Sequence, residues 1–194
     1  MNHGTVDEIH NPRTGQRMRF LPVENDVLRI ETVNPPAGEA EPVHVHPRQE
    51  SSVELVSGSL RFVVDGSEHR LGPGDALTIP AGVPHNFVND GDVDAVAIQA
   101  FSPALRTEAF FRVWFDLSRR GEIGESGMPS LLRLAVLAPE FGDEIRVARP
   151  PWFVQRTVFA LLAPVARLRG YRAAPAPRTA PVYARAARRA SRRA

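Results

Sequence analysis

The chain has 194 residues, enough for one folded domain with appended segments, and 24 basic against 22 acidic residues leave a net charge of +2. It contains no cysteine, which excludes disulfides, thiolate metal sites and cysteine nucleophiles. Residues 172–194 hold seven arginines and no acid, so the rest of the chain carries 17 basic against 22 acidic residues, which argues against a nucleic-acid-binding body.

Residues 11–101 have the pattern of short β-strands separated by turns rich in Gly, Pro, Asn and Asp. Apolar and polar residues alternate, most clearly over residues 28–32, as they do in a strand with one buried face. The expected strands are residues 16–21, 27–33, 53–56, 60–64, 68–71, 76–79, 86–88 and 93–101. Many short strands at regular spacing predict an antiparallel barrel or jelly roll.

After Ser102-Pro103 the apolar period becomes helical. Helices are expected around residues 110–117, at 131–137 and at 152–168, and the tail over 172–194 is expected to be disordered. We therefore divide the chain into a barrel (11–101), helices packed on the barrel or on a partner subunit (102–171) and the arginine-rich tail. The first helix carries an aromatic stripe that could instead cover the barrel mouth. Broad apolar stripes on the helices predict a homodimer.

The start of the chain lacks the basic and then apolar pattern of a signal peptide, and no apolar run reaches the roughly 18 residues of a spanning helix. We therefore expect a cytoplasmic protein with no membrane partner and no nucleic-acid partner.

Three histidines form the most informative pattern in the sequence. His44 and His46 lie two residues apart, so a strand directs both side chains to one face. If the strand that begins near His85 lies beside them, three imidazoles converge on one point. Neutral imidazole is a common ligand of divalent first-row metals, and three of them leave coordination positions open for a substrate. The simpler alternative is a set of solvated or structurally hydrogen-bonded histidines, which is our reading of His3, His10 and His69.

The two histidine segments together resemble the sequence motifs of the cupin superfamily. The second motif of that family is matched in full by Gly74, Pro80, Gly82, His85 and Asn89. The first is matched by Gly38, His44, His46 and Gly58. The resemblance covers roughly residues 25–101 and implies a mainly β fold, a cupin-type antiparallel jelly-roll barrel, here with a C-terminal helical extension. In detail the chain looks like small single-barrel cupins of unassigned substrate.

The carboxylate ligand of the first motif is where the chain departs from the family. Counting back from Gly58, the family's glutamate falls on Ser51, and Glu50 lies one position too early. Strand parity directs Ser51 with Val53 toward the barrel and Glu50 away from it, because a shift of one residue reverses the face. Three alternatives stay open: Glu50 turns inward as a fourth ligand, three histidines and water hold the metal, or the barrel has lost its metal.

The resemblance implies a mononuclear metal oxidoreductase, of dioxygenase type, acting on a small organic molecule. Fe(II) is the preferred candidate for the metal, and Mn, Ni or Zn are the alternatives. The ligands would be His44, His46, His85 and Glu50. The candidate substrate pocket consists of Gln49, Ser51, Leu55, Phe62, Phe87 and Gln99. The alternative is a non-catalytic ligand-binding or regulatory barrel with a degenerate metal site, so whether the chain is an enzyme stays open. No residue is identified as a general acid or base.

Overall fold

The structure is a computed structural model that describes residues 7–37 and 40–172. The strands are β1 (Glu8–His10), β2 (Arg17–Phe20), β3 (Leu28–Asn34), β4 (His44–Val45), β5 (Glu50–Ser57), β6 (Leu60–Val64), β7 (Ser67–Leu71), β8 (Ala76–Ile79), β9 (His85–Val88), β10 (Ala95–Ser102) and β11 (Arg146–Val147). The helices are α1 (Thr107–Arg119), α2 (Leu131–Leu137) and α3 (Trp152–Leu168).

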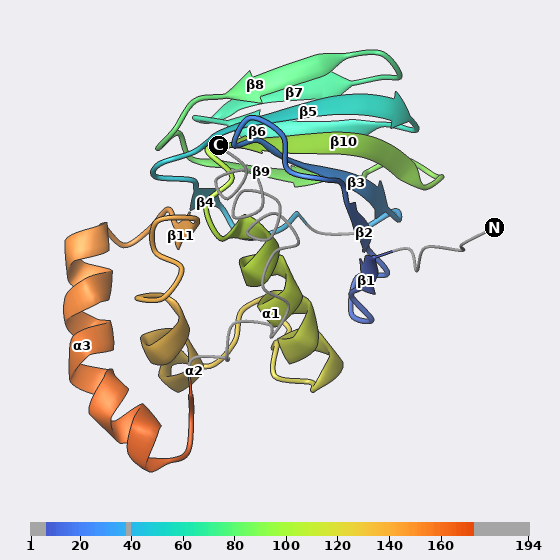
Figure 1. Ribbon diagram of the computed structural model, residues 1–194. Coiled ribbons are helices and arrows are strands. Elements are labelled where there is room, and N and C mark those ends of the chain that lie inside the picture. The colour runs from blue at the N-terminus through green and yellow to red at the C-terminus, as the bar shows by residue number, and fades with distance from the viewer. Residues whose placement is uncertain (1–6, 38–39, 173–194) are drawn as a thin grey trace, which may run out of the picture.

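The strands form two antiparallel sheets that face one another (Figure 1). One has the order β1-β2-β3-β10-β5-β8 and the other the order β11-β4-β9-β6-β7. A core of buried side chains such as Val53, Leu55, Leu60 and Phe62 draws on strands of both sheets, so it lies between them. The fold is mainly β, an antiparallel jelly-roll barrel with a C-terminal helical extension, which confirms the fold class that the sequence predicts.

Strand β5 shows how the sequence sets the two faces of the sheet. Its burial alternates, with Ser51, Val53 and Leu55 buried and Glu50 and Glu54 exposed, as the period of two requires. Gly58 ends the strand in a turn with φ +79°. A Cβ atom there would lie 2.8 Å from the Cα of Ala95, so the turn needs both the backbone freedom of glycine and its lack of a side chain.

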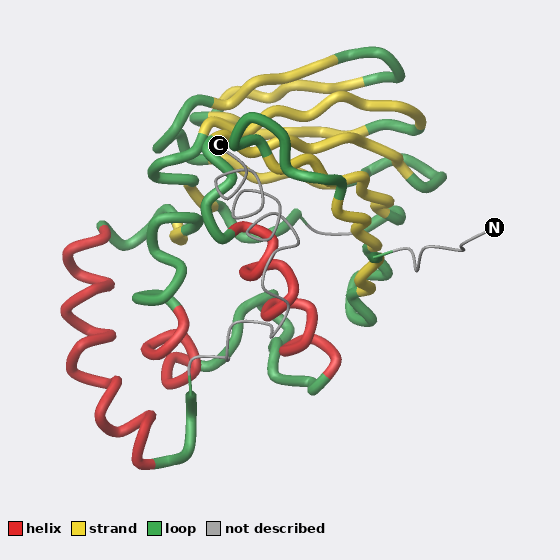
Figure 2. The backbone as a smooth tube through the Cα atoms, in the orientation of Figure 1, coloured by secondary structure: helices red, strands yellow, loops and turns green. Residues whose placement is uncertain are grey.

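The helices gather on one side of the barrel, as the ribbon and the tube both show (Figures 1 and 2). α2 and α3 span the residues that the sequence predicts, whereas α1 begins at Thr107, ahead of the aromatic stripe. Helices α2 and α3 pack on each other. A separate apolar cluster, which includes Val113 of α1 and Val136 of α2, joins the helices to one another.

Two short strands, β1 and β11, escape the sequence prediction, whereas β4 is the strand expected at the histidine pair and ends at Val45. β11 has two residues, too few for a period to be read, and it forms only through tertiary pairing. β11 pairs antiparallel with β4, with Val147 opposite His44. The helical segment therefore adds a strand to the barrel beside a histidine of the motif.

None of the helices described combines the length and apolar content that a bilayer crossing requires. The outer face of α3 is nevertheless apolar and exposed at Phe153, Leu161 and Leu168. Residues 173–194 of the predicted tail lie outside the described residues.

Candidate metal centre

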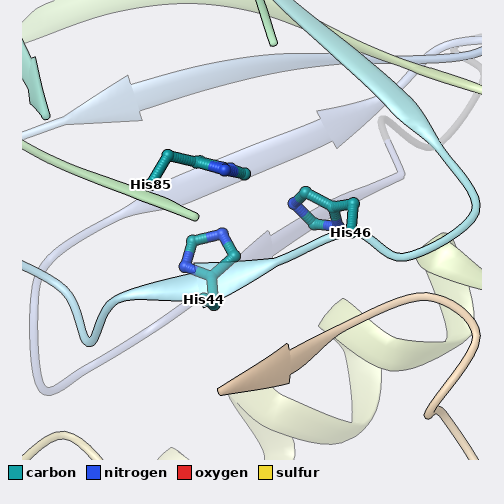
Figure 3. Close-up of side chains that lie close together, drawn as sticks. All are labelled: His44, His46 and His85. Carbon is teal, nitrogen blue, oxygen red and sulfur yellow. The ribbon is translucent and has the colours of Figure 1, made fainter. Parts of the chain in front are cut away.

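The barrel brings His44, His46 and His85 together. His44 begins β4, His46 follows that strand, and His85 begins β9, where the register pairs it directly with His44. One ring nitrogen from each histidine lies within 4.8 Å of the others, and the rings point toward a common centre (Figure 3). The ring centroids are 4.5 to 5.2 Å apart. The convergence that strand parity predicts is present in the structure.

Each of the three rings is oriented by a backbone carbonyl. Nδ1 of His44 donates to the carbonyl of Pro42 at 3.0 Å, and Nδ1 of His85 donates to that of Val83 at 2.9 Å. Nδ1 of His46 donates to the carbonyl of Glu144, 2.7 Å away in the helical segment. A carbonyl can only accept, so Nδ1 carries the proton in each ring and Nε2 keeps its lone pair free for a ligand bond.

Burial keeps the three imidazoles neutral. Desolvation lowers the pKa of His44 well below its usual value, and the neighbouring His46 and His85 lower it further. Burial lowers the pKa of His46 to about 4, against the opposing effect of its hydrogen bond to the Glu144 carbonyl. Burial also lowers the pKa of His85. All three lone pairs are therefore available at neutral pH.

This donor set fits a divalent first-row metal ion. Neutral imidazoles whose second nitrogen is held by a hydrogen bond are the usual histidine ligands of such ions. Within residues 7–37 and 40–172, the group that could hold an ion consists of these three histidines and includes no carboxylate. Glu50 is exposed at the start of β5, whereas Ser51 is buried and faces the cavity.

A cavity of about 310 Å³ opens beside the histidines. Four of the six predicted pocket residues line it: Ser51, Phe62, Phe87 and Gln99. Phe62 and Phe87 stack on each other with centroids 5.2 Å apart, and Gln99 presents a buried amide from β10. The barrel half of the cavity therefore combines aromatic and aliphatic side chains with polar ones such as Ser51 and Gln99.

Gln49 and Leu55, two of the predicted pocket residues, lie outside the cavity lining. The Gln49 side-chain amide is fully buried and donates to the carbonyls of Pro103 and Ala104 and to the Thr107 hydroxyl. It therefore fixes the connection from β10 into α1. Leu55 packs into the apolar core between the two sheets.

Sequence reasoning missed Glu41, whose side chain lines the cavity. Its Oε1 lies 3.6 Å from Nδ1 of His44, and burial raises the pKa of the carboxyl to about 8. The side chain is 36% exposed and lines the cavity. Glu41 lies in a connection without periodicity, and no sequence signal marks it.

The comparisons with known proteins concern the barrel. Residues 31–101 match the family model described as a cupin domain. The chain is 34% identical to quercetin 2,3-dioxygenase of Bacillus subtilis over 62 residues, which are 32% of this chain and 18% of that protein. It is 36% identical to protein SchB of Streptomyces halstedii over 66 residues, 34% of this chain and 48% of that protein. The matches thus cover less than half the length of either relative.

One solved structure that the chain is similar to is an RmlC-like cupin from Shewanella frigidimarina, with 24% identity and a TM-score of 0.46. The alignment covers 56% of this chain and 96% of that one.

Proposed function

We propose, from the premise that residues 31–101 of this chain are a cupin domain, that it is a mononuclear metal oxidoreductase of dioxygenase type acting on a small organic molecule. One observation carries the proposal. Three neutral histidines converge on a cavity with Nδ1 of each ring tied to a carbonyl and Nε2 left free. The weak similarity to quercetin 2,3-dioxygenase supports the choice of reaction class.

His44, His46 and His85 would hold the metal ion, with Fe(II) as our first choice. Bound there, Fe(II) would supply Lewis acidity and one-electron chemistry toward dioxygen, with positions open for a substrate. Glu50 is exposed and would have to turn inward to become a fourth ligand, so we assign the ion to the three histidines.

The chain's own residues would bind and orient the substrate. Phe62, Phe87 and Phe101 form apolar walls that exclude water from the space next to the histidines. The Gln99 amide lines the same space and can hydrogen bond to a polar atom of the substrate. The Glu41 carboxyl can hold a proton on the cavity wall beside His44.

Metal analysis of protein purified without chelators tests the proposal. We expect near-stoichiometric metal in the wild type and loss of it in His46→Ala, with the fold retained by circular dichroism. His69→Ala is the matched control, because His69 is exposed on β7 and is not a member of the histidine group. Metal content unchanged by His46→Ala would refute the site. If His46→Ala does lose the metal, oxygen uptake that depends on iron and on an added organic substrate would establish the reaction class.

A second candidate function, a non-catalytic ligand-binding or regulatory barrel, is favoured by the missing carboxylate. Ser51 is buried on the cavity wall where the family motif has glutamate, and serine is a poor ligand for these ions. If the wild type is empty and Ser51→Glu binds metal, the site has lost its metal and the barrel is a ligand-binding domain. The same variant in a protein that already holds iron should raise metal affinity without changing which histidines are needed.

A further inference from the structure

We propose that the helical segment completes the ligand chamber, and that the chamber takes an aromatic molecule of more than one ring. The ring system would lie among the aromatic side chains of the helices, and an oxygen of the ligand would lie at the histidines. Only the oxygen end rests on the proposed metal site.

The cavity is continuous from the barrel into the helices. Its lining includes Val53 and Phe101 in the barrel, Phe111 and Trp114 in α1, Leu137 in α2 and Phe159 in α3. All three helices lie outside the part of the chain that matches the cupin model. The volume of about 310 Å³ falls at the lower end of small-molecule sites, which typically occupy about 300 to 1,000 Å³.

A chain of aromatic rings leads from the histidines to the helices. Phe101 lies 5.2 Å from His46 and 5.9 Å from Phe111, measured between ring centroids. Phe110 continues the chain, 5.4 Å from Phe111 and 5.5 Å from Trp114. Aromatic rings at such spacings prefer edge-to-face or offset contact with further rings.

The rings of α1 keep free surface toward the cavity. Phe110, Phe111 and Trp114 are only half-buried, although they lie between the barrel and the other helices. Aromatic residues that served only to pack the helix on the barrel would be expected to lose nearly all of their exposed surface. All three also line the cavity, so a ligand there can contact them.

The residues of α1 that line the cavity are all apolar, so this face offers no charged partner to an ionic ligand. Arg146 lines the cavity outside α1, where its guanidinium lies 4.3 Å over the Trp152 ring and its Nε donates to the Gly142 carbonyl. Arg13 and Glu125 join the N-terminal segment to the loop ahead of α2, where Arg13 Nη2 donates to the Glu125 carbonyl. A sugar phosphate would need unengaged buried donors that the α1 face of the cavity does not offer.

The helical half is anchored to the histidines. β11 pairs with β4, and the Glu144 carbonyl accepts the hydrogen bond that orients His46. The distance between the histidines and the aromatic rings is therefore set by the fold. A ligand that spans both must be rigid and of matching length, which fused rings satisfy better than a flexible chain, because less conformational entropy is lost on binding.

Both tryptophans of the chain, Trp114 and Trp152, line the cavity, so intrinsic fluorescence reports its occupancy. We would compare catechol with 2,3-dihydroxynaphthalene by calorimetry and by tryptophan quenching, on Zn²⁺-loaded protein so that neither diol is oxidised. The two probes carry the same pair of oxygens and differ by one ring. We expect the naphthalene diol to bind at least about tenfold more tightly, because the second ring is buried against aromatic side chains.

Phe110→Leu and Phe111→Leu keep apolar volume but remove a ring, and each should reduce that preference about threefold to tenfold. Phe153→Ala is the matched control, since Phe153 is an aromatic residue of α3 that is 73% exposed and outside the cavity lining. Equal affinities for the two diols in metal-loaded protein, or a preference unaffected by both leucine variants, would overturn the inference and leave the metal site standing. Failure of Zn²⁺ to bind, with the preference for the naphthalene diol intact, would overturn the metal site and leave the aromatic chamber standing.

Discussion

The barrel and the helical segment contribute to one cavity in different ways. The barrel supplies all three histidines, and their carbonyl acceptors at Pro42 and Val83 lie two residues away in the same chain segments. The helical segment supplies the third acceptor, the Glu144 carbonyl, 98 residues from His46 in the sequence, and most of the aromatic wall. The chemistry is therefore encoded locally, whereas the shape of the chamber depends on long-range packing.

The largest change in stability is expected from a substitution in the core of the barrel, because the barrel carries the histidines and supports the helical segment. Leu55 is 1% exposed between the two sheets, so Leu55→Ala should lower the free energy of unfolding by about 2 to 5 kcal/mol. Val56→Ala, on the exposed side of the same strand, should change it by less than about 0.5 kcal/mol. Urea unfolding measures both. Similar values for the two variants would show that the core does not lie where the structure places it.

The buried histidines predict a pH dependence of stability in metal-free protein. Folded His46 stays neutral down to its pKa of about 4, whereas the unfolded chain takes up a proton below about pH 6.5. The unfolded state thus binds more protons in this interval, and stability falls as the pH is lowered through it. His46 alone should account for a loss of about 3 kcal/mol.

His46→Gln isolates that contribution, because the other titrating groups are present in both proteins. These groups are His44, His85 and Glu41, and the raised pKa of Glu41 makes stability change with pH in the opposite direction. The difference in unfolding free energy between wild type and variant should shrink as the pH falls from 6.5 to 4. Chemical unfolding at several pH values measures it, with His69→Gln as the exposed control. A difference that does not vary with pH would contradict the burial of a neutral His46.

The dependence of the barrel site on the helical segment can be tested at Glu144. Its buried side chain accepts a hydrogen bond from the Arg106 backbone N–H at 3.1 Å and so fixes the segment whose carbonyl orients His46. Glu144→Ala should weaken metal binding about tenfold, as is typical when support behind a ligand is lost. Glu140→Ala removes only a surface ion pair with Arg106 and should leave the affinity unchanged.

Competition with a chelating dye measures the metal affinity of both glutamate variants. An unchanged affinity in Glu144→Ala, together with lowered stability, would mean that the helical segment supports the fold without orienting the ligand.

The smallest effect on monomer stability is expected on the outer face of α3. Leu161 is 72% exposed, so Leu161→Ser should change the unfolding free energy of a monomer by less than about 0.5 kcal/mol. The homodimer stays a prediction, and the same variant tests it: light scattering should show a dimer for the wild type and a shift toward monomer for Leu161→Ser. A monomeric wild type would contradict it. The cytoplasmic location likewise stays a prediction.

Local sequence determined most of the barrel strands, the three helices and the convergence of the histidines. Strand parity placed Ser51 inward and Glu50 outward, and the spacing of His44 and His46 placed both rings on one face. The motif around His85 marked the strand that lies beside them. These inferences succeed because the period of a strand is set by its own backbone, and because two short motifs carry all three histidines.

Tertiary structure alone decided the rest. β11 is too short to have a period and exists because it pairs with β4. The Gln49 side chain, close to the histidine motif in sequence, donates a hydrogen bond to Thr107 at the start of α1. Glu41 lines the cavity although it lies in a segment without regular secondary structure. From the sequence alone, the aromatic stripe of α1 is compatible either with a face that packs on the barrel or with a cover for the barrel mouth. The choice depends on where α1 lies relative to the barrel, which is fixed by contacts between residues distant in the chain.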